Sequence, residues 1–207
     1  MMNKYDEQII VVDRESIFSH EKNAFNGFIT IEDQRALEIF ETLSKYEVRR
    51  RGDMEETPEY KQLISYCVLE NEEGEILVYK RLTGGGEERL HGLSSIGVGG
   101  HMNQLAGDDI ERILIENARR ELEEEVGLTD IPDSDLELIG LINDDGHEVG
   151  RVHIGLVFKI CVNRADVRAV ETDTLSIQWV DKNRLMDVPA YETWSRLIIE
   201  AMYTPGH

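Results

Sequence analysis

Five charged side chains stand close together between Arg120 and Glu125. The segment reads Arg-Glu-Leu-Glu-Glu-Glu, and three of its four acidic residues are Glu121, Glu124 and Glu125. On a helix these three positions (i, i+3 and i+4) fall within about 100° of one another, so their carboxylates share one face. Carboxylates packed this closely repel, and a hard divalent cation such as Mg²⁺ or Mn²⁺ would relieve that repulsion. The alternative is a solvated acidic helix face.

Apolar residues behind the acidic positions predict that this helix packs on a sheet. They recur at every fourth position, as Ile110, Leu114, Ala118, Leu122 and Val126. Gly127 follows where a helix C-cap is expected. Asp108 and Glu111 form a capping box, so we expect the helix to start near Asp109. The acidic side chains would then face outward.

The run from Arg120 to Leu128 resembles the signature of the Nudix (MutT-like) hydrolases, G-x5-E-x7-R-E-U-x-E-E-x-G-U, where U is aliphatic. It satisfies every fixed position of the second half. The first half departs from the pattern: if Gly100 is the leading glycine, the distance to Arg120 is 120 − 100 = 20 positions, six more than in the signature. The first glutamate of the signature falls on Arg112, one position after Glu111, so we do not assign that role.

The resemblance covers roughly residues 61–203. The glycine-rich stretch from Gly84 to His101 looks like a less-characterised branch of the family, known in general terms as phosphoesterases. Family resemblance implies a hydrolase that cleaves a phosphoanhydride (pyrophosphate) bond in a nucleoside diphosphate linked to another group, by attack of metal-activated water. Glu121, Glu124 and Glu125 would bind Mg²⁺ or Mn²⁺, and Arg120 would orient them through charge-assisted hydrogen bonds.

Two other functional classes stay open. One is a catalytically silent Nudix-fold protein that senses a nucleotide, although the intact glutamates argue against it. The other is a Nudix-fold isomerase acting on isopentenyl diphosphate, suggested by the run Gly99-Gly100-His101. No cysteine stands near a glycine-histidine loop to protonate an alkene, which argues against the isomerase.

Six residues are candidates for substrate binding. The glycines would let the backbone approach phosphates, and the cations flank a glycine-rich loop. A glycine pair is also a common turn, and a histidine often satisfies only local hydrogen bonds. The candidates are Gly99, Gly100, His101, Lys80, Arg81 and Arg89.

A general base outside the acidic run is expected on a late loop. Glu171, in the stretch Val170–Thr174 before a predicted strand, is the first candidate. The Asn143–Glu148 loop is the second. A solvated loop acid is the alternative for Glu171, and one of the glutamates between Arg120 and Leu128 could itself serve as base.

Composition favours an intracellular enzyme. The chain has 207 residues with 41% hydrophobic content and a formal net charge of −20, which disfavours nucleic acid and anionic membranes as partners. No apolar run reaches transmembrane length, and the first residues do not form a signal peptide. Cys67 and Cys161 lie in apolar runs and are expected to be core thiols in a reducing compartment. We therefore expect a cytoplasmic protein.

The order of predicted elements indicates an α/β (α+β) fold, an α-β-α sandwich around a mixed sheet as the resemblance also implies. We expect residues 61–207 to form the Nudix hydrolase domain that the resemblance implies, and residues 1–60 to form a strand-helix extension that packs on it or serves as the arm of a homodimer. The amphipathic helix Ile31–Leu43 should turn Leu37 and Phe40 inward. The closing helix, Tyr191–Tyr203, should bury Trp194, Leu197, Ile198 and Ala201. Strands are expected at Gln8–Val12, Lys61–Glu70, Glu75–Lys80, Leu136–Ile142, Val152–Val162 and Leu175–Val180.

Overall fold

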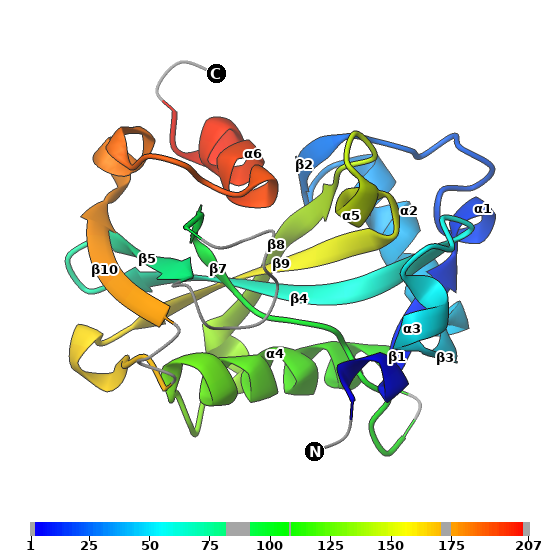
Figure 1. The fold of residues 1–207 in the computed structure, drawn as a ribbon, viewed down its shortest axis with the longest axis horizontal. Helices are drawn as coiled ribbons and strands as arrows, with labels where there is room; N and C mark the ends of the chain where they lie inside the picture. Colours follow the sequence, from blue (N-terminus) through cyan, green and yellow to red (C-terminus); the bar gives the residue numbers. More distant parts are fainter. Residues whose placement is uncertain (1–2, 82–91, 108, 171–174, 205–207) are drawn as a thin grey trace.

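A mixed β-sheet lies between helices on its two faces (Figure 1). The computed structural model describes residues 3–81, 92–107, 109–170 and 175–204, with the side chains of Arg81 and Leu175 left aside. Helix α4 (Ile110–Val126) covers one face and helix α6 (Thr193–Met202) covers the other. This arrangement confirms the predicted α-β-α sandwich.

The described part of the chain forms a ten-stranded sheet whose main path runs in the order β10-β5-β4-β9-β8-β2. Strands β4 and β9 pair in parallel from Gln62–His153 to Asn71–Val162, and the remaining pairs are antiparallel. All six predicted strands are confirmed. The bounds are β1 Gln8–Asp13, β2 Gly27–Thr30, β3 Glu47–Arg50, β4 Tyr60–Asn71, β5 Glu75–Arg81, β6 Ser94–Ser95, β7 Gly97–Val98, β8 Leu136–Asn143, β9 His153–Val162 and β10 Leu175–Asp181.

Helix α2 (Gln34–Thr42) begins three residues later than predicted, because the Asp33 side chain caps it by accepting the Arg35 N–H at 2.9 Å. Its buried stripe runs through Ala36 and Ile39. The prediction that Leu37 points inward is wrong: Leu37 lies about 100° around the helix from Ala36 and is 44% exposed. The other short helices are α1 Arg14–Ile17, α3 Arg51–Met54 and α5 Glu148–Arg151.

Helix α6 buries Ser195, Ile198 and Ile199 against the sheet. Trp194 and Leu197 pack beside them, as predicted. The prediction for Ala201 is wrong: Ala201 is exposed, because it lies about 200° around the helix from the buried Ile199.

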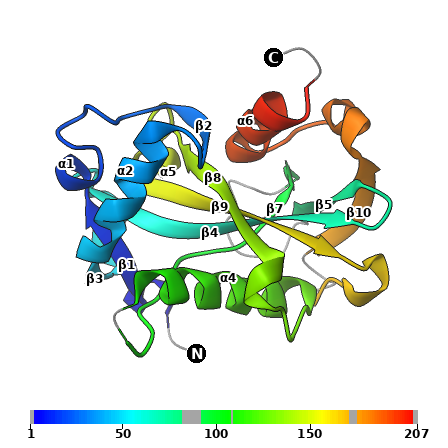
Figure 2. The ribbon, with the colours of Figure 1, turned by 180° about the vertical axis from the view of Figure 1, so that it is seen from behind.

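The first sixty residues share the sheet with the rest of the chain. Strand β1 pairs with β3 and, at Val11–Gln62, with β4. Strand β2 pairs with β8 at Phe28–Ile142, and α2 lies beside this edge of the sheet (Figure 2). The strands of this segment therefore form their β-sheet hydrogen bonds with other strands of the same chain.

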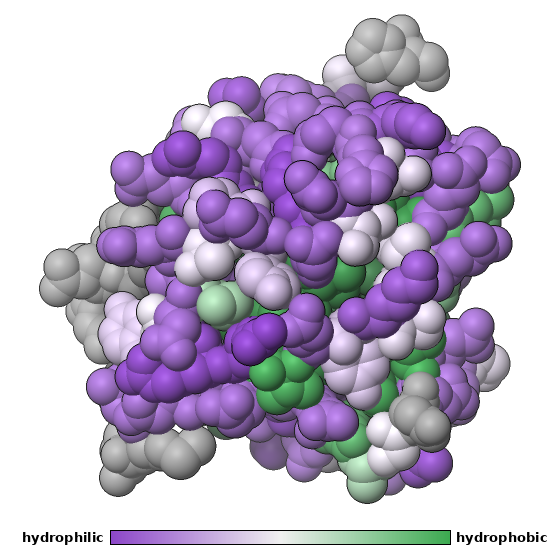
Figure 3. All heavy atoms as spheres, turned by 90° about the vertical axis from the view of Figure 1, so that its right-hand side faces the viewer, coloured by the Kyte–Doolittle hydropathy of each residue, from purple (hydrophilic) through white to green (hydrophobic). Residues whose placement is uncertain are grey.

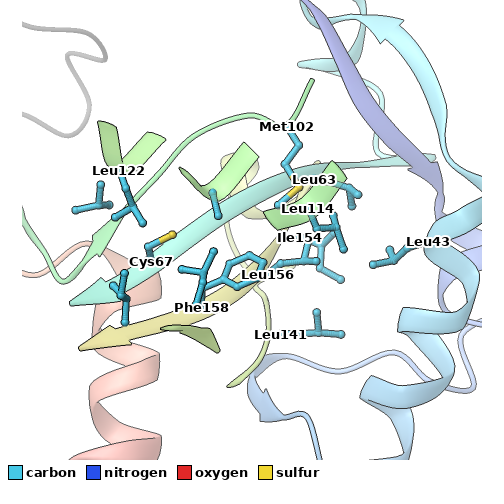
Figure 4. Close-up of a cluster of buried hydrophobic side chains, with 14 of the residues drawn as sticks. Leu43, Leu63, Cys67, Met102, Leu114, Leu122, Leu141, Ile154, Leu156 and Phe158 are labelled. Carbon is cyan, nitrogen blue, oxygen red and sulfur yellow. The ribbon is translucent and has the colours of Figure 1, made fainter. Parts of the chain in front are cut away.

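The larger apolar core lies between the sheet and α4. Leu63, Cys67 and Leu122 are fully buried in it (Figure 4). Cys161, which we expected in the core, is exposed: that prediction is wrong, because Cys161 stands near the end of β9, where its neighbour Val162 is only half-buried. The face formed by the N-terminal elements is mainly hydrophilic (Figure 3). None of the described helices has the length and apolar character to cross a membrane.

Candidate active site

Helix α4 carries the acidic run, and its two ends are fixed by capping. Asp109 caps the start by accepting the backbone N–H groups of Glu111 and Arg112, and the predicted cap Asp108 lies outside the described residues. At the other end Gly127 takes a left-handed conformation (φ 68°), and the N–H of Leu128 bonds to the Leu122 carbonyl at 3.2 Å. The predicted stop at Gly127 is confirmed. So is the apolar ridge: its last four members are buried and Ile110 packs against the core.

Glu121 does not face outward as we expected. Its side chain is only 11% exposed, and one carboxylate oxygen faces Gly100 so closely that a Cβ there would lie 2.7 Å from it. Burial raises the pKa of Glu121; the charges of Glu124 and Glu7 raise it further, and Arg120 opposes the shift. A carboxylate this desolvated repels a second anion and attracts a cation.

Arg120 links the acidic run to the loop that follows Gly100. One of its terminal nitrogens, Nη2, donates to Oε1 of Glu121 at 2.7 Å and to the backbone oxygen of His101 at 2.8 Å. The other, Nη1, donates to Oδ1 of Asn103. Its Nε lies 4.0 Å from Glu124. The guanidinium is thus half-buried and fixed by three acceptors.

In this structure the carboxylates of Glu121, Glu124 and Glu125 do not converge on one point. The side chain of Glu124 is 63% exposed, whereas Glu121 is buried. Within the described residues no group of three histidine, cysteine or acidic side chains is arranged to hold a metal ion. The donors nevertheless have the types and helical spacing that suit a hard divalent cation. The Glu121 carboxylate can lie against residue 100 because that residue is a glycine.

Asn103 and Asn117 belong to this site, although sequence analysis missed them. The buried side chain of Asn117 accepts the backbone N–H of Asn103 at 2.8 Å and donates to its carbonyl at 2.9 Å. This pair of hydrogen bonds between a side-chain amide and the backbone fixes the loop at the point that Arg120 contacts. The signal available was a polar residue at position 117 on the buried side of α4, one turn before Arg120.

The glycine pair is used for close packing. A Cβ at Gly99 would lie 1.8 Å from the carbonyl oxygen of Ser65 in β4, so only glycine fits. Gly100 then accepts the N–H of Ser65 at 2.9 Å. These contacts hold the loop on β4 in front of Glu121.

His101 is half-buried and bonded to other residues of the chain instead of being open to a ligand. Its Nε2 lies 2.8 Å from Oε1 of Gln62 and 3.1 Å from Nε2 of His153. Nδ1 of His153 donates to the Val149 carbonyl at 2.6 Å, so Nε2 of His153 is left as an acceptor and His101 is the donor. Burial lowers the pKa of His101 well below its ordinary value, and His153 adds to the effect. Neutral His101 therefore anchors the loop between β4 and β9.

The cationic candidates are spread apart. Lys80 is exposed. Because side chains alternate along a strand, Lys80 lies on the same face of the sheet as Val78, the face that α6 covers. The side chain of Arg81 and all of Arg89 lie outside the described residues. The basic run at residues 49–51 is paired with carboxylates of its own region, with Arg50, for example, on Asp6 and Asp53.

Glu171 also lies outside the described residues. The residue before it, Val170, donates its N–H to the carbonyl of Glu125 at 3.1 Å, and Arg168 donates to that of Val126. The chain therefore reaches the C-terminal end of α4 just before Glu171. In the Asn143–Glu148 loop, by contrast, Asp145 is held by Arg14 and Lys61 at the other end of β4.

Comparisons with known proteins agree with this geometry. The profile of the NUDIX domain matches residues 61–202. Protein YmaB of Bacillus subtilis (strain 168) is 38% identical, over 97% of this chain and all of its own length. The crystal structure of Tm1382, described as a candidate Nudix hydrolase, superposes with a TM-score of 0.76 at 27% identity, covering 95% of this chain and 98% of that one.

More distant structures show the same fold. The MutT protein of Methanosarcina mazei Go1 covers 68% of this chain and 91% of its own, with 24% identity and a TM-score of 0.52. The NUDIX domain of Shewanella oneidensis NrtR, solved with ADP-ribose, covers 68% of this chain and 86% of its own, with 14% identity and a TM-score of 0.51.

Proposed function

Since this chain belongs to the NUDIX domain family, we propose that it is a metal-dependent hydrolase of a phosphoanhydride bond in a nucleoside diphosphate linked to another group. One observation carries the proposal: the buried carboxylate of Glu121 is held by Arg120 and lies directly against Gly100. The exposed Glu124 and half-buried Glu125 stand on the same face of α4. Glu121, Glu124 and Glu125 would hold Mg²⁺ or Mn²⁺.

The chain's own residues prepare the reaction by fixing charge in one place. Arg120 orients Glu121 and favours its ionised form, and the two hydrogen-bonded neighbours of Arg120, His101 and Asn103, prevent the guanidinium from turning away. The loop from Gly99 to His101 presents backbone rather than side chain to the incoming phosphates. A divalent cation bound here would neutralise charge on the diphosphate and lower the pKa of the attacking water.

A general base completes the proposed mechanism. Glu171 is the first choice, supported by the contact of its neighbour Val170 with the Glu125 backbone. Glu148 of the second candidate loop is exposed on α5, and none of the contacts described for its loop involves α4. A carboxylate near the attacking water would accept its proton as the phosphoanhydride bond breaks.

The test combines a substrate screen with two matched variants. Phosphate release would be measured over nucleotides, nucleotide sugars, dinucleotides, coenzyme A and ADP-ribose, with Mg²⁺ and with Mn²⁺. Glu125→Gln removes a ligand charge at nearly constant volume and should lower kcat on the order of 100-fold. Glu123→Gln changes an exposed glutamate of the same helix and should leave kcat unchanged. Equal activity of the two variants at saturating metal would contradict the assignment.

We further infer a cytoplasmic homodimer. The net charge of −20 and the exposed thiol of Cys161 suit a soluble protein in a reducing compartment. Leu37, exposed on α2 beside the edge strand β2, offers an apolar contact for a second copy. Light scattering tests the dimer, and a monomeric mass at micromolar concentration would contradict it.

A further inference from the structure

One side-chain amide, that of Asn103, bridges the N-terminal segment and the catalytic helix. Its Nδ2 donates to Oε1 of Glu7 at 2.9 Å and to the backbone oxygen of Gln8 at 2.8 Å. Its Oδ1 accepts a hydrogen bond from Arg120. All three contacts agree with the donor and acceptor ends of the amide, so a flipped amide would lose every one of them.

The backbone of Asn103 is fixed independently of these contacts. Asn117 on α4 bonds to both its N–H and its carbonyl. On the next residue back, the carbonyl of Met102 accepts the N–H of Ile10 in β1 at 2.8 Å. The side chain of Asn103 therefore leaves a rigid backbone and reaches Glu7 and Arg120 in one orientation.

Glu7 is itself held in place. Its backbone oxygen accepts the N–H of Arg51 at 2.8 Å, and Oε2 lies 3.3 Å from the Arg51 guanidinium. Both side chains are partly buried, at 31% and 19% exposure. Its charge also contributes to the raised pKa of Glu121, so the carboxylate of Glu7 lies within electrostatic reach of the site. Glu7 is not part of the Nudix signature.

We propose that Glu7 is a positioning residue that orients Arg120 through Asn103, which makes the N-terminal segment a working part of the hydrolase centre. The carboxylate of Glu7 polarises the Asn103 amide and strengthens Oδ1 as an acceptor for one arm of Arg120. The other arm is then committed to Glu121 and His101. The proposal rests on the proposed function, because it assigns Arg120 and Glu121 to that reaction.

Four variants of the full chain test the proposal. Glu7→Ala and Asn103→Ala each remove the bridge and should lower kcat about tenfold, as loss of an outer-shell contact does, with KM within about twofold. Glu7→Gln keeps an acceptor for Asn103 and should restore most of kcat. Asp6→Asn breaks a neighbouring ion pair with Arg50 that does not reach Asn103, so it should match the wild type.

A second measurement does not depend on turnover. The Nε–H signal of Arg120, assigned in ¹⁵N NMR spectra by its loss in Arg120→Lys, should be that of an ordered guanidinium in the wild type and in Glu7→Gln. It should become mobile in Glu7→Ala. An ordered Arg120 with unchanged kcat in Glu7→Ala would overturn the proposal, even if the variant were less stable. Mobility gained in Glu7→Ala, in a protein that hydrolyses no compound of the screen, would support the bridge and count against the proposed function instead.

Discussion

Gly100 and Glu121 are in contact across the loop and the helix. A Cβ at Gly100 would lie 2.7 Å from Oε2 of Glu121 and 3.0 Å from its carboxyl carbon. Both distances are shorter than van der Waals contact allows. The Glu121 carboxylate can therefore take this place only because residue 100 has no side chain.

We predict that Gly100→Ala lowers activity more than it lowers stability. The added methyl group would push the Glu121 carboxylate out of its place by several tenths of an ångström, and kcat should fall at least about tenfold. Gly146→Ala is the control, since its Cβ would meet only the Asp144 carboxylate at 3.1 Å, in a loop away from α4. Steady-state kinetics and urea unfolding of both variants provide the comparison. Wild-type kcat in Gly100→Ala would show that Glu121 needs no fixed position.

Asn117→Leu should cost both stability and activity. Asn117 is 1% exposed, and besides its two bonds to Asn103 it donates to the Ile113 carbonyl at 2.8 Å. Leucine has a similar volume but leaves buried backbone groups of Asn103 unpaired, so the free energy of unfolding should fall by about 2 kcal/mol. Glu111→Gln, at an exposed position of the same helix, should change it by less than about 0.5 kcal/mol. A thermal or urea melt decides, and equal stability of both variants would contradict the role of Asn117.

Because of the ion cluster around Asp145, the free energy of unfolding should fall in acid. We call this part of the curve of stability against pH the acid limb. Burial alone would raise the pKa of Asp145, but hydrogen bonds from Arg14 and Lys61 outweigh it and lower the pKa to about 2. The unfolded carboxyl keeps its ordinary pKa of 3.8. Between these values the unfolded state binds more protons, so the stability that the carboxylate contributes is present above about pH 4 and is lost as the pH falls toward 2.

Asp145→Asn should remove this limb and lower stability at neutral pH. Lys61 is fully buried, and burial lowers its pKa to about 8 even with Asp145 beside it. Without the carboxylate its charge is uncompensated, and the free energy of unfolding should fall by about 3 kcal/mol at pH 7. Glu21→Gln, at a 54% exposed partner of Arg14, should cost less than about 1 kcal/mol. An unchanged slope of stability between pH 4 and 2 in Asp145→Asn would contradict the assignment.

Local pattern was sufficient to predict α4 and the strands. The four-residue ridge, the stop at Gly127 and the apolar runs of β4 and β9 are properties of neighbouring residues, and the structure retains them. Burial within short helices was predicted less well. Leu37 and Ala201 fit an apolar stripe, but the direction of the stripe is set by the layer that the helix meets.

The part of the site that sequence did not predict depends on distant contacts. Glu7 and Asn103 are 96 positions apart, and nothing in either neighbourhood indicates the other. The expected outward direction of Glu121 failed because this residue lies on the buried side of α4, one turn after Asn117, where its carboxylate contacts Gly100. The residue types along α4 identify the chemistry. The contacts of their side chains depend on where the loop before α4 is attached to the rest of the fold.

Glu171→Gln tests the proposed general base. The described stretch 109–170 stops at Val170, whose N–H bonds to the Glu125 carbonyl at the C-terminal end of α4, and the proposed mechanism gives Glu171 the role of proton acceptor. If Glu171 accepts the proton, the pH–rate profile of the variant should lose its acidic limb and its maximal rate should fall about 100-fold. Glu148→Gln, in the second candidate loop, is the matched control and should keep both. If Glu171→Gln keeps its acidic limb and its maximal rate, the base is elsewhere, and a profile for Glu124→Gln becomes the next measurement.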